Sequence, residues 1–385
     1  MPRFEGKYIP KIPRFGTTIF AVMSRLAGQH GAINLSQGFP DFPVSNELID
    51  RVNHYMKKGC NQYAPMQGIP ELRRAIADKV ESIYGVRYNP EEEINITAGA
   101  TQALYTVISC AVHPGDEVIL FTPVYDSYAP AVEINGGISI DIPLKRPDYS
   151  IDWDAVRKKV GPRTRMIIIN TPHNPTGSTL SQEDMEQLDD ITRGTDILVL
   201  SDEVYEHIIF DGKVHQSILR YSGLIQRSFV VFSFGKTFHV TGWKMGYCLA
   251  PANLMKEFRQ VHQFMVYACN TPIQYAFADF LKQKENYEGI GDFYQKKRDL
   301  FLKLIKNSRF RFKPASGSYF QLLEYGDITR EKDTQFAERL TKEYGVASIP
   351  VSVFYPRPVD FKVLRFCFAK TEETLEKAAA ILSNI

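Results

Sequence analysis

Residues 165–177 read Arg165-Met166-Ile167-Ile168-Ile169-Asn170-Thr171-Pro172-His173-Asn174-Pro175-Thr176-Gly177. An unbroken apolar run that ends abruptly in polar and turn-forming residues is typical of a strand buried on both faces. Helix-like stretches separate it from four further apolar runs, which lie at 94–97, 117–121, 197–200 and 229–232. We therefore predict an α/β fold, in which a large domain carries a mostly parallel sheet covered by helices.

The pattern changes beyond Asn270. A long helical stretch rich in Lys and Arg is followed by shorter strand-like and helical segments, which predicts a smaller α+β domain. We expect the large domain at 46–275, and a small domain formed by 276–385 together with 1–45, which includes an N-terminal arm. The C-terminal segments are expected as a helix at 292–308, strands at 311–314 and 319–325, a helix at 334–344, a strand at 363–368 and a helix from Glu372.

The composition excludes several classes of protein. The 385 residues include 46 Lys and Arg against 44 Asp and Glu, a formal net charge of +2. This balance provides no field that attracts nucleic acid or an anionic membrane, and no apolar run approaches the roughly 18 residues of a membrane helix. The five cysteines form no C-x-x-C pair, which disfavours a zinc site and favours a reducing cytoplasm. We predict a cytoplasmic protein that acts through a specific small-molecule site and holds no metal.

Polar residues follow three of the buried runs where each strand is expected to end. Asn174 follows the first run, Asp202 and Tyr205 follow the second, and Ser233 and Lys236 follow the third. In open α/β sheets, ligands bind in the crevice beyond the carboxyl ends of the strands. The sequence therefore predicts that these five side chains converge on one site.

Lys236 allows several interpretations when it is considered alone. Gly235-Lys236-Thr237 resembles the end of a P-loop, but that motif requires a glycine where Val230 stands, so nucleotide binding is rejected. Ser233 and Lys236 fit the S-x-x-K of penicillin-binding serine enzymes, although no S-D-N or K-T-G triplet accompanies them. A surface lysine in a turn is the remaining alternative.

The neighbouring strand ends favour a third chemistry for Lys236. Pyridoxal phosphate is bound through a lysine Schiff base, and an acid keeps its pyridine nitrogen protonated so that the ring withdraws electrons. Asp202 is suited to be that acid, because a carboxylate and a pyridinium stabilise each other's charge. Tyr205 and Asn174 are suited to donate hydrogen bonds to the phenolic oxygen of the cofactor.

Three motifs carry a family resemblance at these positions. They are Asn174-Pro175-Thr176-Gly177, Ser201-Asp202-Glu203-Val204-Tyr205, and Ser233-Phe234-Gly235-Lys236-Thr237-Phe238-His239-Val240-Thr241-Gly242-Trp243-Lys244-Met245-Gly246-Tyr247. With these three motifs in this order, the chain resembles the class I, fold-type-I aminotransferases that depend on pyridoxal 5'-phosphate, over essentially its full length. The resemblance implies their fold, a large cofactor domain and a smaller domain.

The resemblance also implies which residues bind the cofactor. Lys236 would form the Schiff base and, once released by substrate, shuttle the proton between the α-carbon and the exocyclic carbon of the cofactor. Ser233 and Lys244 would hold the phosphate, although the family commonly has Arg at the second position. The backbone of the turn at Ala100 and Thr101 would also meet the phosphate. The aromatic residue that stacks on the cofactor ring matches Tyr125, and the partners of the ring nitrogen and the phenolic oxygen match Asp202, Tyr205 and Asn174.

Substrate contacts follow from the same resemblance. Arg365 matches the arginine that grips the α-carboxylate of the substrate, where two parallel donors suit two oxygens. Asn174 and the backbone of Gly38 would complete that site. Phe20 aligns with an aromatic residue of the substrate pocket, and Phe354 is a weaker candidate for the same role.

A further match concerns the oligomeric state. Tyr63 matches a tyrosine that reaches the phosphate of the neighbouring subunit, so the resemblance implies a homodimer with a shared active site.

The segment 34–43 is most similar to kynurenine aminotransferases, glutamine transaminases and bacterial methionine aminotransferases, and the segments 63–66 and 205–207 favour the methionine branch. We therefore predict a ping-pong aminotransferase that moves the amino group of a methionine-like, aromatic or glutamine-like amino acid to a 2-oxo acid. A cysteine-conjugate or cystathionine β-lyase with the same cofactor is the alternative. A ligand-sensing regulator is disfavoured, because the sequence carries no DNA-binding segment and retains Lys236.

Overall fold

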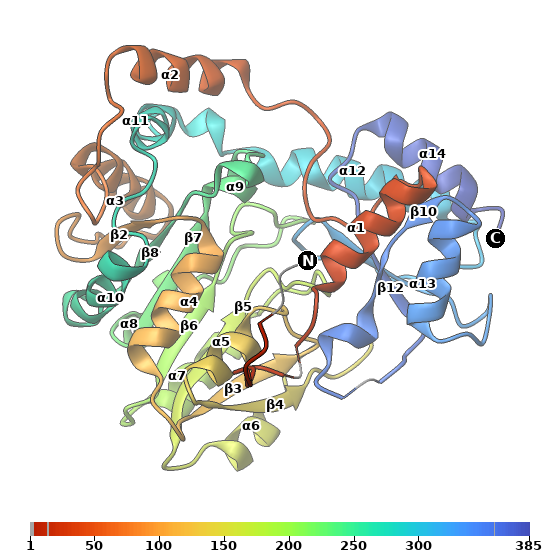
Figure 1. Ribbon diagram of the computed structural model, residues 1–385, viewed down its shortest axis with the longest axis horizontal. Coiled ribbons are helices and arrows are strands. Elements are labelled where there is room, and N and C mark those ends of the chain that lie inside the picture. Colours follow the sequence, from red (N-terminus) through yellow and green to blue (C-terminus); the bar gives the residue numbers. More distant parts are fainter. Residues whose placement is uncertain (1–3, 14, 358) are drawn as a thin grey trace.

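The computed structural model describes residues 4–13, 15–357 and 359–385. Its centre is a seven-stranded sheet in the order β2-β8-β7-β6-β5-β3-β4 (Figure 1). β8 runs antiparallel to both of its neighbours, and the other neighbouring pairs are parallel, which confirms the predicted mostly parallel sheet. The seven strands are β2 (Ile94–Thr97), β3 (Glu117–Thr122), β4 (Ile138–Pro143), β5 (Thr164–Asn170), β6 (Leu198–Asp202), β7 (Ser228–Ser233) and β8 (Gly246–Leu249).

Helices cover both faces of this sheet, as the unbroken apolar runs predicted. Met166 and Ile168 of β5 belong to the core cluster that is completed by α4, α5 and α10, whereas Ile167 and Ile169 belong to the cluster of the opposite face. Successive side chains of a strand point to opposite faces, so a strand covered on both sides must be apolar throughout. The helices of the first face are α4 (Ala100–Ala111), α5 (Tyr128–Ile134) and α10 (Ala252–Met265), and those of the second are α3 (Pro70–Tyr84), α6 (Trp153–Lys159), α7 (Gln182–Thr192) and α11 (Thr271–Phe280).

Two strands of the sheet were not predicted from the sequence. β4 lies at the edge, where Ile138 is exposed and only Ile142 is buried, so its apolar residues alternate with polar ones. β8 is buried along its four residues, but its first two, Gly246 and Tyr247, belong to the Lys236 motif, so it was not identified as a separate strand. β4 lacks the continuous apolar pattern that identifies its neighbours.

The second group of elements combines the two ends of the chain. β11, β12 and β9 form an antiparallel sheet, and β1 pairs with β10, so that Ile33 lies opposite Val346. These elements and the helices around them lie together beside the large sheet (Figure 1). They are β1 (Ile33–Asn34), β9 (Phe320–Glu324), β10 (Val346–Ala347), β11 (Ile349–Pro350), β12 (Val363–Cys367), α1 (Ile19–His30), α12 (Ile290–Ile305), α13 (Asp333–Lys342) and α14 (Glu372–Leu382).

Most of the predicted C-terminal segments agree with the structure to within a few residues, but the strand at 311–314 does not. That segment contributes only a single bridge, between Arg311 and Glu324. The domain boundaries at 46–275 and 276–385 stay a prediction. The remaining helices are α2 (Asn46–Lys57), α8 (Ser222–Ile225) and α9 (Phe234–Thr237), with short 3₁₀ turns at Ile218–Arg220, Thr241–Trp243, Lys284–Asn286 and Val351–Phe354.

The register of the parallel strands brings the three strand ends together. Asn170, the last residue of β5, lies opposite Asp202, the last residue of β6, and Asp202 in turn lies opposite Val231 of β7. The segments that follow these strands therefore leave the sheet from one edge. Within the described ranges, no helix is long and apolar enough to cross a membrane, and no cluster of His, Cys, Asp or Glu is arranged to hold a metal ion.

Candidate active site

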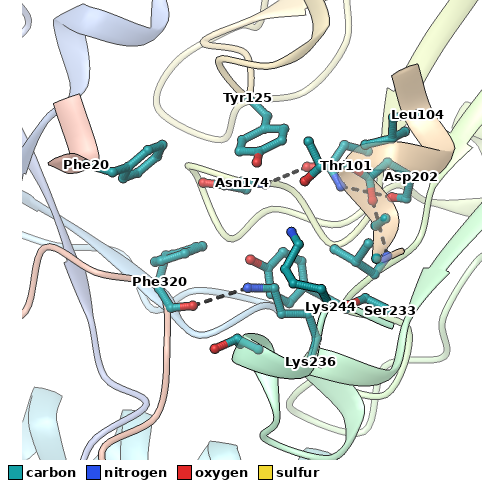
Figure 2. A pocket seen from close by; sticks show the side chains of 18 of the residues that line it. Phe20, Thr101, Leu104, Tyr125, Asn174, Asp202, Ser233, Lys236, Lys244 and Phe320 are labelled. Carbon is teal, nitrogen blue, oxygen red and sulfur yellow. Dashed lines mark hydrogen bonds between the residues drawn. The ribbon is translucent and has the colours of Figure 1, made fainter. Parts of the chain in front are cut away.

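A cavity of about 230 Å³ opens at the carboxyl edge of the sheet. Figure 2 shows Phe20 and Phe320 at one end of it, Thr101, Asp202 and Ser233 at the other, and Lys236 between them. Nearly all of the side chains and backbone positions that the sequence predicted for the site line this one cavity: Phe20, Gly38, Ala100, Thr101, Tyr125, Asn174, Asp202, Tyr205, Ser233, Lys236, Lys244 and Arg365.

One end of the cavity is built to receive an anion. The helix α4 begins after Gly99, which has a φ of 78° and provides no side chain to cap the first backbone N–H groups. The positive φ favours glycine at this position, and the side chain of Lys244 lies in van der Waals distance of where a Cβ would be. Ser233 and Lys244 line the same end of the cavity. Backbone donors, a helix dipole and an ammonium group together form a phosphate-sized cradle.

Asp202 is a buried carboxylate beside this cradle. Its Oδ2 accepts a hydrogen bond of 2.6 Å from the hydroxyl of Tyr128, and its Oδ1 accepts one of 3.3 Å from the backbone N–H of Val204. Burial raises the pKa of Asp202 to about 6, against the lowering effect of these two hydrogen bonds. A cation placed against this carboxylate would restore its charged form, because opposite charges stabilise each other in a buried site.

The segment after β5 is held in place by a second hydrogen-bonded pair. Asn170 Nδ2 donates to the carbonyl oxygen of Asp202 over 2.9 Å, and Asn170 Oδ1 accepts from the backbone N–H of Asn174 over 2.7 Å. The amide of Asn170 therefore ties the 174–177 motif to the end of β6, which fixes the position of Asn174 in the cavity.

Lys236 presents a buried amine to the cavity. Its Nζ donates hydrogen bonds to the hydroxyl of Tyr319 over 2.7 Å and to the carbonyl oxygen of Gly38 over 3.2 Å. Burial lowers the pKa of Lys236 to about 8, so a neutral, nucleophilic amine is accessible near neutral pH. Among the described residues, the hydrogen bonds of this amine go to Tyr319 and Gly38 and not to Ser233, which gives no support to a serine nucleophile activated by lysine.

Arg365 is a buried cation without an anionic partner. Its Nη1 donates to Oδ1 of Asn174 over 2.7 Å and its Nη2 to the carbonyl oxygen of Ser36 over 2.9 Å, while its Nε lacks a partner in the described part of the chain. No ion pair of Arg365 occurs among the described residues. Burial lowers its pKa to about 10. Because an unpaired buried charge is costly, this guanidinium is poised to bind a carboxylate.

Aromatic rings surround that guanidinium. Its central carbon lies 3.9 Å from the ring centre of Phe320, 5.1 Å from that of Phe20 and 5.5 Å from that of Phe354. Phe354 is outside the cavity lining but packs on Phe20, with ring centres 6.0 Å apart. An anion on Arg365 would therefore lie beside an apolar wall, which suits a ligand with a carboxylate and an apolar side chain.

Tyr63, which was predicted to reach a phosphate, lies outside the cavity. Its side chain is 83% exposed and makes an edge contact with Tyr267, with ring centres 5.5 Å apart. This position does not test the predicted contact with a neighbouring subunit, because that contact would be made to another copy of the chain.

Several residues of the site were not found from the sequence. Thr241 and Met245 lie within the Lys236 motif and Val204 within the Asp202 motif, but no role was predicted for them, and the others reach the cavity or its hydrogen-bond partners through the fold. The full set is Gln37, Leu104, Tyr128, Asn170, Val204, Thr241, Met245, Tyr319 and Phe320. A weak signal existed for Tyr128, which lies three residues after Tyr125, immediately at the start of α5. Tyr319 and Phe320 carried no local functional signal, because their segment, 319–325, was predicted only as a strand outside the large sheet.

Comparison with known proteins agrees with this geometry. Residues 30–382 match the family described as aminotransferase class I and II. The methionine aminotransferase of Escherichia coli strain K12 is 47% identical over 376 residues, which cover 97% of each protein. Kynurenine–oxoglutarate transaminase 3 of Rattus norvegicus is 32% identical over 406 residues, which cover 97% of this chain and 89% of the rat protein. The crystal structure of YbdL from Escherichia coli, described as having a methionine aminotransferase function, matches with a TM-score of 0.96 and 47% identity over 98% of this chain and 100% of that one.

The fold and the match together define a fold-type-I transferase that depends on pyridoxal phosphate. The chain belongs to the class I and II aminotransferases, and it is an aminotransferase enzyme. The residues of the cavity fit the cofactor. The anion cradle at Gly99 and Lys244 suits the phosphate, the buried Asp202 suits the cationic ring nitrogen, and the amine of Lys236 suits the aldehyde.

Proposed function

We propose that this cavity is the active site, in which the chain moves the amino group of an apolar α-amino acid to a 2-oxo acid in two ping-pong half-reactions. The observation that carries the proposal is the meeting of a buried amine, a buried carboxylate and an anion cradle in one cavity. The ends of β6 and β7 supply the carboxylate and the amine, and the start of α4 supplies the cradle together with Ser233 and Lys244. Bound pyridoxal phosphate supplies an electron-withdrawing ring that stabilises negative charge at the α-carbon of the substrate.

The cofactor-binding roles follow the chemistry of each group. We assign the phosphate to Ser233, Lys244 and the backbone of Ala100 and Thr101, because these donors form the anion cradle. Asp202 would hold the ring nitrogen, and the hydroxyl of Tyr128 would keep that carboxylate charged and oriented. Tyr205 and Asn174 would donate hydrogen bonds to the phenolic oxygen, and Tyr125 would stack on the face of the ring. Figure 2 places Tyr125 across the cavity from Lys236.

The substrate-binding roles rest on the unpaired guanidinium. We propose that Arg365 binds the α-carboxylate of the amino acid, with Asn174 and Gly38 completing the site. Asn174 Oδ1 already accepts from Nη1 and therefore holds the guanidinium plane in place. Nε has no hydrogen-bond partner and, among the described residues, no carboxylate forms an ion pair with Arg365, although the charge of Asp126 acts on it from a distance. The guanidinium can therefore accept a negatively charged ligand.

Lys236 would move the proton in each half-reaction. Its amine would accept the proton of the substrate α-carbon on Nζ, hold it as an ammonium and release it later in the same half-reaction. The lowered pKa of Lys236, about 8, suits this role, because a proton carrier works best when its pKa lies near the working pH.

Methionine and aromatic amino acids are the donors that we propose. The wall formed by Phe20 and Phe320 is apolar and lies next to Arg365. The methionine aminotransferase relative, at 47% identity, supports the same substrate class. The relatives reported above are all aminotransferases, which favours transamination over the β-lyase alternative.

We further propose a cytoplasmic homodimer with a shared active site. Tyr63, Tyr267 and Phe264 are exposed aromatic residues, and Phe264 is 88% exposed. Neighbouring exposed aromatic side chains such as Tyr63 and Tyr267 are typical of a protein–protein interface. A second copy of the chain would cover them and bring its own Tyr63 to the phosphate. The five cysteines, which are all free, are consistent with a reducing compartment.

The covalent role of Lys236 is tested by the variant Lys236→Ala. We expect it to lose the visible absorption of lysine-bound cofactor together with transamination, because Nζ of Lys236 is the amine that we assign to the aldehyde, whereas Lys244 is assigned to the phosphate. Lys282→Ala is the matched control, since Lys282 is an exposed lysine that pairs with Asp279. Unchanged absorption and activity in Lys236→Ala would refute the proposed active site.

Donor preference is tested by a panel of amino acids with several 2-oxo acids as acceptors. We expect methionine and phenylalanine to exceed aspartate and glutamate in kcat/KM. Pyruvate and ammonia formed from a cysteine conjugate without any acceptor would instead indicate a β-lyase.

A further inference from the structure

Tyr319 makes a second set of contacts at the Lys236 amine that the assigned roles do not use. It is fully buried and stands immediately before β9. Its hydroxyl donates a hydrogen bond to the carbonyl oxygen of Gly38 and accepts one of 2.7 Å from Lys236 Nζ. The same Nζ also donates to the carbonyl oxygen of Gly38, over 3.2 Å. Tyr319, Gly38 and Lys236 thus form a closed triangle of hydrogen bonds.

The number of hydrogens fixes the direction of each bond in this triangle. A phenol has one O–H, and that of Tyr319 is given to Gly38, so the phenolic oxygen acts toward Lys236 as an acceptor. A neutral amine has two N–H groups and one lone pair. Both N–H groups of Lys236 are occupied, one by Tyr319 and one by Gly38. The lone pair is therefore the one position of this amine that remains unengaged, on a side chain that lines the cavity.

We propose that Tyr319 is a positioning residue, which holds the free amine of Lys236 with its lone pair available for the proton of the substrate. The inference rests on the proposed role of Lys236. When Nζ takes the proton, the bond from the α-carbon to hydrogen breaks, its electron pair stays with the substrate, and the ammonium has three N–H groups. Two of them stay on Tyr319 and Gly38, so the new one is the mobile proton that Lys236 later releases.

The surroundings of Tyr319 hold the hydroxyl in this position. Its ring packs edge-on against Tyr205, with centres 5.1 Å apart, and against Tyr294 at 5.7 Å. A Cβ atom at position 38 would come within 3.3 Å of the ring of Tyr319 and 2.7 Å of that of Phe320, so only glycine permits this approach. Burial raises the pKa of Tyr319 well above its usual value. The hydroxyl therefore keeps its proton at any working pH and continues to donate to Gly38.

The variant Tyr319→Phe in the holoenzyme tests the inference, because it keeps the ring and removes only the hydroxyl. Tyr88→Phe is the matched control, since the hydroxyl of Tyr88 is buried and has no partner in the described part of the chain. In single-turnover reactions with methionine, we expect the rate constant of Tyr319→Phe to fall about tenfold while the methionine Kd changes less than about twofold. Tyr88→Phe is expected to behave as the wild type.

A second measurement separates positioning from a general loss of structure. Acetylation of Lys236 by acetic anhydride in the cofactor-free protein, followed by mass spectrometry across pH, reports the pKa of its amine. We expect a midpoint near 8 in the wild type and a lower midpoint in Tyr319→Phe, because the phenolic oxygen stabilises the ammonium form. A loosened fold without a positioning role would raise the methionine Kd and leave this midpoint in place.

The outcomes distinguish this inference from the proposed function. If Tyr319→Phe equals the wild type in single-turnover rate and acetylation midpoint, while Lys236→Ala loses the cofactor absorption, this inference alone is wrong. If Lys236→Ala keeps that absorption, the proposed function is wrong and the inference falls with it. Should Tyr319→Phe fail to fold, Tyr319→Met also removes the hydroxyl and fills the space with a flexible apolar side chain, and the same outcomes apply.

Discussion

The hydroxyl of Tyr128, at the start of α5, donates a hydrogen bond of 2.6 Å to Oδ2 of Asp202, at the end of β6. Two opposing effects therefore act on one carboxyl group. Burial favours the neutral acid, whereas the hydroxyl favours the carboxylate that a cationic ring nitrogen requires. Tyr128 also touches Tyr125 edge-on, with ring centres 5.6 Å apart, so one side chain supports two of the groups that we assign to the cofactor.

The variant Tyr128→Phe should weaken cofactor binding. It leaves the ring in place but removes the donor to Asp202, and a hydrogen bond to a charged group contributes about 1.5–3 kcal/mol, which corresponds to a rise in Kd of roughly 10- to 100-fold. Titration of the cofactor-free protein with pyridoxal phosphate, followed by absorption, measures this Kd. Tyr88→Phe is the control, and an equal Kd in both variants would contradict the role of Tyr128.

The sequence predicted the strand-end residues of the site from the apolar runs, and Arg365, Phe20 and Gly38 from the family resemblance. Asn174, Asp202 and Lys236 each follow an apolar run directly, so a pattern read along the chain finds them. Tyr319 lies 83 residues from Lys236 and meets it only through packing of the second group of elements on the sheet. Its position depends on tertiary contacts that leave no periodic signal, which is why sequence patterns could not reveal it.

The same reasoning explains the errors in the predicted fold. A buried central strand such as β5 must be apolar on both faces, which makes it visible in the sequence. β4 has one neighbour and a half-exposed surface, so it does not impose that pattern, whereas the apolar stretch of β8 overlaps the Lys236 motif and was not separated from it. The predicted strand at 311–314 is polar enough for an edge but pairs only through Arg311.

The pKa of Asp202 predicts how pH affects the stability of the cofactor-free chain. The pKa is raised from 3.8 to about 6, so between these values the folded state binds more protons than the unfolded state. Stability therefore falls as the pH rises from about 4 to about 6, by up to roughly 3 kcal/mol, and stays reduced above that range. Asp202→Asn removes this cost, so we expect it to be more stable than the wild type at pH 7.5 and no more stable at pH 4.

Urea unfolding of the two cofactor-free proteins at both pH values measures the difference. The order should reverse in the presence of pyridoxal phosphate, because the asparagine side chain cannot pair with a cationic ring nitrogen. An Asp202→Asn protein that gains no stability over the wild type between pH 4 and pH 7.5 would show that the pKa of Asp202 is not raised in the folded chain.

The exposed side chain of Phe264 predicts a dimer that a single charge can dissociate. Phe264, Met265 and Tyr267 are exposed apolar residues of one short segment. We expect a second copy of the chain to cover them. Phe264→Asp would bury a carboxylate without a partner, which is costly, and should shift the protein to monomers in sedimentation experiments. Cofactor affinity should fall with it, because Tyr63 of the second copy would be lost from the phosphate. Val214→Asp places the same charge at another exposed apolar position and should remain dimeric. A monomeric Phe264→Asp protein that binds the cofactor as tightly as the wild type would refute the shared site.

The wall beside Arg365 predicts how activity depends on the size of the amino acid. Phe20 lies 5.1 Å from the guanidinium carbon and faces the cavity, so it is placed to contact a side chain whose α-carboxylate is bound there. Phe20→Ala removes that contact, and burial of one large apolar side chain contributes about 1.5–3 kcal/mol. We expect kcat/KM to fall roughly 10- to 100-fold for methionine and phenylalanine, and by less than about threefold for alanine, whose methyl group is too short to reach the ring. Steady-state kinetics with these three donors measures the selectivity, and cofactor absorption, which should not change, is the internal control. An equal loss for all three donors would mean that Phe20 supports the position of Arg365 and does not contact the substrate side chain.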